Sequence, residues 1–280
     1  MNKLSKAVLV ALGLVTLASC GGGDGGIAAG GTGGTGISQG SISGFGSVYI
    51  NGVKFSTDST TTTTVEDNPG TGQAGLKLGM VATVEWEKDA TTGKYRAKTI
   101  KYSDDVQGPF TITGASTLTV LGQSVIVDAL TIFEGDGITS VTSLAGLPAD
   151  RVVEVSGLED NTGAIHASRI ELKTIGATFE MKGIVSNASG TTFTLGTQAV
   201  SLSGTAALPT NGACVEVKGA ALSGAALVAT VVETDDSCTL GGTVAANMEV
   251  ELEGYVSGFS ASGFKVNGQS VQVTSATVYD

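Results

Sequence analysis

The stretch that decides the fold is "VNGQSVQV", Val266 to Val273, which has a near copy, "VLGQSVIV", at Val120 to Val127. In the first copy, alternating apolar residues lie on both sides of Asn267-Gly268. A type I′ turn needs two residues that tolerate positive φ, and Asn-Gly satisfies this need well. The pattern therefore predicts a β-hairpin, and its recurrence predicts a repeated unit.

The hairpin belongs to a longer unit that recurs four times along the chain. The units open with "GSISGF" from Gly40, "GPFTIT" from Gly108, "GIVSNA" from Gly183 and "GYVSGF" from Gly254. The hairpin turns follow at Asn51-Gly52, Leu121-Gly122, Gly196-Thr197 and Asn267-Gly268. The apolar register around the turn is kept, so we expect the same strands in every unit.

A second strand pair follows in each of the first three units. Its first member is "VATVEW" from Val81, "VVEVSG" from Val152 or "CVEVKG" from Cys214. Its second member is "AKTI" from Ala97, "ASRI" from Ala167 or "ATVV" from Ala229. Five short strands per unit predict an all-β chain of small five-stranded, OB-like Greek-key barrels in tandem. Units this small have thin cores, so we expect neighbours to dock.

The predicted units span residues 40–103, 108–173, 178–238 and 249–280. The fourth ends at "TSATVYD", after its third expected strand. It is therefore expected to be incomplete, with open sheet edges. Two explanations remain open: the sequence is a fragment of a longer chain, or the open sheet receives a strand from a partner.

The shared pattern is G-x-V, F-x-V-N-G, V-x-V, V-E-V-x-G and A-x-x-I. It resembles a bacterial family of domains of unknown function, number 5666, from Gly40 to the end of the chain. The resemblance implies an exported, often lipid-anchored protein whose function is uncharacterised.

The N-terminus is typical of an export signal. "MNKLSK" supplies positive charge, and the apolar run "AVLVALGLVTLA" is too short for a membrane-spanning helix. Leu17 to Cys20, "LASC", resembles the lipobox of bacterial lipoproteins, so residues 1–19 are predicted to be removed and Cys20 to be lipidated. An ordinary signal peptide that contains a cysteine is the alternative. Gly21 follows the cysteine instead of Asp, which favours the outer membrane or cell surface over retention in the inner membrane.

Residues 20–39 are rich in glycine and are predicted to form a flexible linker after the anchor. Two familiar patterns fall within or at the end of it: G-x-G-x-x-G at Gly31, Gly33 and Gly36, and G-x-S-x-G from Gly36 to Gly40. The first needs a strand before it and a helix after it, and the second needs a strand-turn-helix elbow with a histidine partner. Neither context is predicted, so both matches are attributed to composition.

With Cys20 lipidated, Cys214 and Cys238 remain as an even pair and are predicted to form a disulfide. Two free thiols are the alternative. The formal net charge of −11 repels phosphate backbones, so nucleic acid is not an expected partner.

Candidates for catalysis or metal binding are few. His166 is the only histidine and is expected on a solvated strand face. Asp104-Asp105, Asp235-Asp236 and Glu134 to Gly137 are interpreted as solvated charges, because no dedicated calcium loop is present. No catalytic residue, metal or cofactor is therefore expected.

The sequence thus favours an exported, lipid-anchored envelope protein that acts as a modular binding or structural element and not as an enzyme. Its expected partners are the membrane, through the lipid, and a glycan or another envelope protein. Tyr49, Trp86 and Tyr95 are candidates for an aromatic platform that would bind a sugar, but they are too few to decide the question. An assembly or adhesin subunit whose strands pair between molecules is the alternative. An unrecognised envelope enzyme is less favoured, because no set of nucleophile, base and orienting group is visible.

Overall fold

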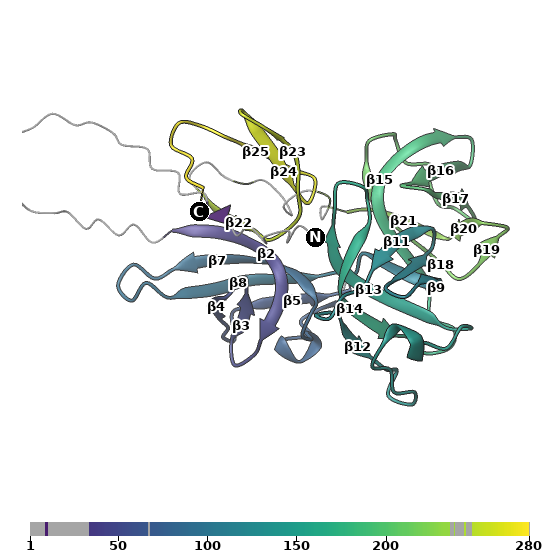
Figure 1. Ribbon diagram of the computed structural model, residues 1–280, viewed down its shortest axis with the longest axis horizontal. Helices are drawn as coiled ribbons and strands as arrows, with labels where there is room; N and C mark the ends of the chain where they lie inside the picture. The colour runs from purple at the N-terminus through teal and green to yellow at the C-terminus, as the bar shows by residue number, and fades with distance from the viewer. Residues whose placement is uncertain are drawn as a thin grey trace, which may run out of the picture.

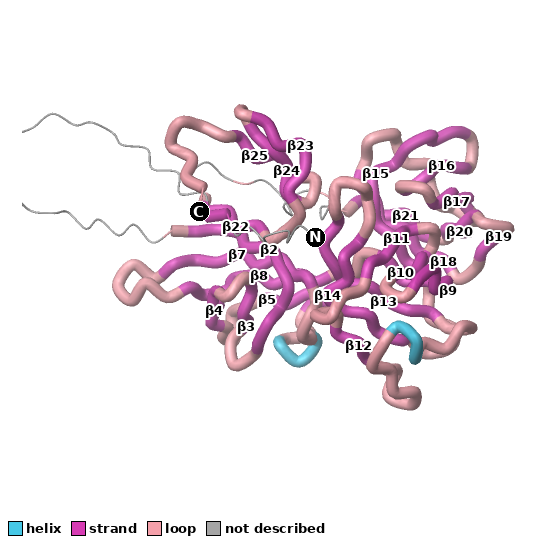
Figure 2. The backbone as a smooth tube through the Cα atoms, in the orientation of Figure 1, coloured by secondary structure: helices cyan, strands magenta, loops and turns pink. Residues whose placement is uncertain are grey.

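The computed structural model describes residues 9–10, 34–66, 68–235, 238, 244 and 248–279. Strands dominate these residues, with two short 3₁₀ turns, η1 (Gln73–Gly75) and η2 (Leu144–Gly146) (Figure 2). The predicted fold class, an all-β chain of small five-stranded barrels in tandem, is confirmed. Cys20 and the linker up to residue 33 lie outside the described residues, as does the predicted signal peptide except β1 (Leu9–Val10). The part of the chain that is described contains no helix long and apolar enough to span a membrane.

The first unit is a closed barrel. Its strands are β2 (Thr35–Gly44), β3 (Val48–Ile50), β4 (Val53–Ser56), β5 (Thr62–Val65), β6 (Asn68–Pro69), β7 (Val81–Lys88) and β8 (Tyr95–Tyr102). Pairing runs β2-β3-β4-β8-β7 and returns to β2, which leaves the main strands without an open edge. β2 begins at Thr35, and Ile37 is 2% exposed, so the last residues of the predicted linker are strand and core instead.

The second and third units share one core. The second unit contains β9 (Val106–Gly114), β10 (Thr117–Val120), β11 (Gln123–Ile126), β12 (Ile132–Glu134), β13 (Val152–Glu159) and β14 (Ile165–Leu172). The third contains β15 (Phe179–Ser189), β16 (Thr192–Leu195), β17 (Gln198–Leu202), β18 (Cys214–Gly219), β19 (Leu222–Ser223), β20 (Ala226–Ala229) and β21 (Val231–Thr234). β9 pairs with β15, and one hydrophobic cluster extends from Val106 through both units to Ala229. The expected docking of neighbours takes the form of a continuous sheet here.

The fourth unit is paired with the first. Its strands are β22 (Glu249–Leu252), β23 (Val256–Ser260), β24 (Gly263–Val266) and β25 (Gln269–Gln272). β22 lies parallel to β2, whereas β23, β24 and β25 form a separate three-stranded sheet (Figure 1). β1 pairs antiparallel with β22. The first and last units are therefore neighbours in space although they are distant in sequence.

The predicted hairpin turns are present. Asn51 and Gly52 have φ of 53° and 78°, and Asn267 and Gly268 have φ of 47° and 77°. Leu121 also has a positive φ, 45°, which an aliphatic residue rarely adopts. Its side chain is 4% exposed and belongs to the core of the second unit. Burial of the leucine offsets the backbone strain at this turn.

Candidate functional site

The predicted disulfide is present in the third unit. Cys214 is bonded to Cys238, and their Cα atoms lie 5.9 Å apart. Cys214 begins β18, which pairs antiparallel with β21 so that Val215 faces Thr234. This register brings the start of β18 close to the chain that follows β21, which allows the two cysteines to meet.

His166 links two units and is not simply a solvated surface residue. Its ring stacks on Tyr255 of the fourth unit with 4.1 Å between centroids, and its Nε2 lies 3.1 Å from Asp160 Oδ2. Burial raises the pKa of Asp160, but hydrogen bonds from Thr162 and His166 outweigh it and hold the pKa at about 2. This histidine is therefore used in a contact between the second and fourth units.

The charged segment from Glu134 to Gly137 forms ion pairs, so its interpretation as solvated charge is wrong. Glu134 contacts Lys77 of the first unit and Arg169 of its own unit. Asp136 accepts a hydrogen bond of 2.5 Å from Arg151. Cationic partners are already present for both carboxylates.

Trp86, one of the three candidate aromatic residues, is not available to stack on a sugar. Trp86 is 2% exposed, and its ring packs edge-on against Tyr95 at 4.8 Å in the core of the first unit. Its Nε1 donates a hydrogen bond of 2.9 Å to Ser38 Oγ. Ser38, the serine of the G-x-S-x-G match, is fully buried and donates to Glu251, so it is a structural residue of β2.

A cluster of four acidic side chains lies where the first and third units meet. Glu66 follows β5 and Asp104 follows β8, while Glu180 is in β15 and Glu216 is in β18. One carboxylate oxygen from each lies within 4.8 Å of the others. We call these four residues the junction carboxylates. Asp104 is 2% exposed, so its interpretation as a solvated linker charge is wrong.

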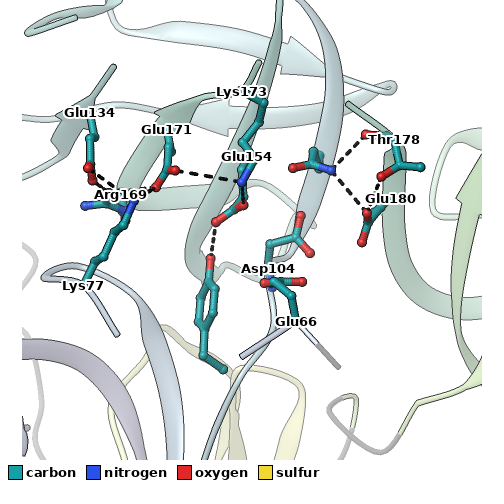
Figure 3. A network of polar contacts seen from close by, with 12 residues as sticks. Glu66, Lys77, Asp104, Glu134, Glu154, Arg169, Glu171, Lys173, Thr178 and Glu180 are labelled. Carbon is teal, nitrogen blue, oxygen red and sulfur yellow. Dashed lines mark hydrogen bonds and ion pairs between the residues drawn. The ribbon is translucent and has the colours of Figure 1, made fainter. Parts of the chain in front are cut away.

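Hydrogen bonds position the junction carboxylates. The backbone nitrogen of Asp104 donates to Glu66 Oε1 at 2.8 Å. Glu180 Oε1 accepts hydrogen bonds from Thr178 Oγ1 at 2.8 Å and Gln107 Nε2 at 3.3 Å. Figure 3 shows Glu66 and Asp104 beside each other, with Glu154 and Glu180 on either side.

The crowding of acidic groups changes their protonation. Burial raises the pKa of Glu66 to about 7, and the carboxylates of Glu154 and Glu180 contribute in the same direction. Burial and then Glu66 raise the pKa of Asp104 well above its usual range. Burial lowers the pKa of Lys182, but Asp104 and the neighbouring carboxylates outweigh it and raise the pKa overall. The raised pKa values of Glu66 and Asp104 show that two adjacent buried negative charges are unfavourable at this junction.

The second unit reaches the same region through Glu154. Glu154 is 5% exposed and accepts hydrogen bonds from Tyr102 Oη at 2.8 Å and Lys173 Nζ at 2.5 Å. The ion pairs continue from Lys173 to Glu171, which also binds Lys77 and Arg169 (Figure 3). This polar network joins the first unit to the second.

Two hollows flank the junction. The larger, of about 760 Å³, is lined by residues of all four units, among them Asp105, Gln123, Lys182 and Gln269. The smaller, of about 520 Å³, is lined by residues of the first and third units, including Lys182 and Glu216, and by Asp105, which lies between the first and second units. Asp105 and Lys182 thus form part of the wall of both hollows.

The sequence held a partial signal for this site. Glu154 and Glu216 occupy the same position of the V-E-V-x-G pattern. Strand alternation predicts that they point away from the barrel core. The alternation cannot show that this outward face is covered by another unit, which turns two apparent surface acids into buried ones.

The fold defines a class of protein: a tandem array of small β-barrels held together by a shared sheet and polar junctions. The pattern of the family described as "Domain of unknown function (DUF5666)" matches residues 37–101, 107–171, 182–233 and 253–280. The chain belongs to this family. No curated protein and no solved structure matches it.

Proposed function

We propose that this protein is an exported, lipid-anchored component of the cell envelope whose tandem barrels form a modular binding or structural element. The observation that carries the proposal is the sequence from Leu17 to Cys20, which follows a positive segment and a short apolar run. A diacylated cysteine anchors durably, because each buried methylene contributes about 0.8 kcal/mol.

Two further observations support the compartment. The Cys214–Cys238 disulfide suits an oxidising environment outside the cytoplasm. Gly21 after the lipidated cysteine favours the outer membrane over the inner one.

The net charge of −11 is unfavourable for binding nucleic acid.

The larger hollow supports a binding role. Ser124, Thr162 and Ser186 contribute hydroxyl groups to its lining, and Gln123 and Gln269 contribute amides. Such groups suit a glycan or the backbone of another envelope protein. Because Trp86 is buried, recognition of a sugar would depend on hydrogen bonds more than on ring stacking.

The anchor is tested by labelling the full chain with an alkyne fatty acid in a bacterial host. We expect label in the wild type and none in Cys20→Ser, while Cys214→Ser keeps the label as a matched cysteine control. Fractionation of the labelled cells is expected to place the protein in the outer membrane. Label on Cys20→Ser would refute the lipoprotein assignment. A glycan array with the unlipidated chain then tests for a sugar ligand.

An assembly role is the second candidate, and the fourth unit favours it. β23 and β25 each pair only with β24 among the described strands, so their outer edges are available to another chain. Phe259 and Tyr279 are 68% and 55% exposed on this unit. Sedimentation of the unlipidated chain over a range of concentrations tests this role, and a monomer at all concentrations would argue against it.

A further inference from the structure

The junction carboxylates carry a second kind of binding site. We propose that Glu66, Asp104, Glu180 and Glu216 bind one Ca²⁺ ion between the first and third units. The proposal depends only on residues that the structure describes and is independent of export and lipidation.

The geometry of the four oxygens fits this ion. Ca²⁺ binds oxygen ligands at about 2.3–2.6 Å, so ligands on opposite sides of the ion lie about 4.6–5.2 Å apart. Mg²⁺ binds at about 2.0–2.1 Å and requires a diameter near 4.2 Å, with nearly ideal octahedral angles. Oxygens within 4.8 Å of one another are close enough to share one such ion, and a site with four carboxylates favours Ca²⁺ over Mg²⁺, which usually keeps several waters and binds only one or two carboxylates. Water from the smaller hollow, whose wall includes Glu216, can complete the coordination.

A second observation is independent of the clustering. Asp104 is 2% exposed, and its Oδ2 has no hydrogen-bond partner among the residues that the structure describes. A buried carboxylate oxygen without a donor is costly, because it has lost water and gained nothing in return. Lys218 lies 3.5 Å from Glu180 and 3.2 Å from Glu216, so it offsets part of the charge at those two residues. Lys182 interacts electrostatically with Asp104, but Asp104 Oδ2 still lacks a donor and is therefore the oxygen that a bound cation would satisfy.

The local charge also favours a bound cation. Eight carboxylates and four lysines gather at this junction within the described ranges: Glu66, Asp104, Asp105, Glu154, Glu180, Glu216, Glu233 and Asp235, with Lys101, Lys173, Lys182 and Lys218. Negative charge is in excess by four when all are ionised. A divalent cation offsets half of this excess and joins two units that share no hydrophobic cluster.

The test uses the full chain with Cys20→Ser, which prevents lipidation and leaves every described residue unchanged. After removal of metals with a chelator, CaCl₂ is titrated by calorimetry and by equilibrium dialysis with radioactive calcium. We expect saturable binding of one ion per chain with a Kd of about 10⁻⁴–10⁻³ M, as in extracellular calcium modules. At tenfold excess over Kd, Tm is expected to rise by about 3–6 °C. MgCl₂ at matched ionic strength is expected to bind at least about tenfold more weakly.

Variants of the junction carboxylates test whether these residues bind the ion. Asp104→Asn keeps the shape of the side chain and removes one charge, so calcium affinity is expected to fall at least about tenfold. Without metal, the Tm of this variant is expected to equal or exceed that of the parent, because repulsion is reduced. Glu66→Gln provides a second variant with the same expected loss. Asp150→Asn is the control, because Asp150 is exposed and lies outside the junction.

Three results would overturn the proposal. The first is no saturable binding of calcium by the parent chain up to about 10 mM. The second is equal calcium affinity in Asp104→Asn, Glu66→Gln and the Asp150→Asn control, which would indicate diffuse counterion binding. Equal affinity for Mg²⁺ and Ca²⁺ would overturn the assignment of the ion.

Discussion

Asn51 lies directly over Gly40, so closely that a Cβ atom on Gly40 would overlap the Asn51 amide. From this position Asn51 Nδ2 donates a hydrogen bond of 3.1 Å to the carbonyl of Gln39. The fourth unit repeats the arrangement, with Asn267 over Gly254 and a bond of 2.6 Å to the carbonyl of Glu253. In the first and fourth units, the opening glycine therefore provides the space that the asparagine of the hairpin occupies.

Substitution of the opening glycine tests whether the asparagine requires this space. Gly40→Ala is expected to destabilise the protein by about 1–3 kcal/mol, because the added methyl group forces Asn51 out of place. The double variant Gly40→Ala with Asn51→Gly is expected to recover part of that loss, since glycine keeps the positive φ without a side chain. Urea unfolding measures both.

Gly44→Ala is the matched control in the same strand. A Cβ atom there would lie 3.4 Å from Tyr49 Cδ2, an ordinary contact, so a smaller effect is expected. Equal losses at Gly40 and Gly44, with no recovery in the double variant, would show that the asparagine does not require the glycine.

The disulfide gives a second prediction. Cys214→Ala combined with Cys238→Ala is expected to lower the free energy of unfolding by about 3.5 kcal/mol in the chain-entropy treatment. The bond closes a loop with a sequence separation of 24. Reductant is expected to destabilise the parent chain by a similar amount and to leave the double variant unchanged. A parent chain that is indifferent to reductant would contradict the prediction.

The ion pair of Asp136 with Arg151 predicts a pH dependence. The hydrogen bond from Arg151, followed by that from the backbone of Thr139, lowers the pKa of Asp136 from 3.8 to about 2. A carboxylate whose pKa is lowered on folding stabilises the fold above its unfolded pKa. That stabilisation is lost as the pH falls from about 4 to about 2.

Asp136→Asn is therefore expected to lower Tm at pH values above about 4 and to have a much smaller effect near pH 2. Thermal unfolding across this range measures the difference from the parent. Asp150→Asn, in which an exposed acid is replaced, is expected to show no such trend. A difference for Asp136→Asn that stays constant with pH would contradict the lowered pKa.

Local sequence patterns predicted the hairpins and the disulfide because both depend on short-range information. Positive φ at Asn51-Gly52 follows from residue type, and Cys214 meets Cys238 through adjacent strands. Contacts between units could not be predicted in this way. The pairing of Gly36 with Glu249 joins segments that are far apart in the sequence, and no local pattern records it.

The alternation of inward and outward side chains along a strand also gave wrong predictions of exposure where another unit covers the outward face. It placed His166 on a solvated face, whereas Tyr255 of the fourth unit covers the ring. The acids at 104 and 105 follow a strand and were expected to be solvated, yet Asp104 is buried by the third unit. Burial of these polar residues is a property of the assembled array and not of a single repeat.

The fourth unit is held in two different ways. β22 shares a backbone ladder with β2, and the nitrogen of Glu253 continues it with a bond of 3.1 Å to the carbonyl of Gln39. The sheet of β23, β24 and β25 contributes only two buried residues, Phe264 and Val266, which form a small cluster with Leu252 of β22. Its contacts with other units include the stacking of Tyr255 on His166 and a hydrogen bond of 2.8 Å from Gln269 to the carbonyl of Cys238.

This difference predicts two levels of protection in hydrogen exchange. Amides of β22 are expected to exchange as slowly as those of β2, because both belong to the same ladder in the folded array. Amides of β23 to β25 are expected to exchange at least about a hundredfold faster, because a three-stranded sheet with so small a core opens locally. Tyr255→Ala is expected to speed exchange in β23 to β25 further and to leave β22 unchanged, whereas Tyr279→Ala serves as the aromatic control. Equal protection across residues 249–272 would show that the fourth unit opens as one body, and fast exchange in β22 would show that its ladder with β2 does not hold in solution.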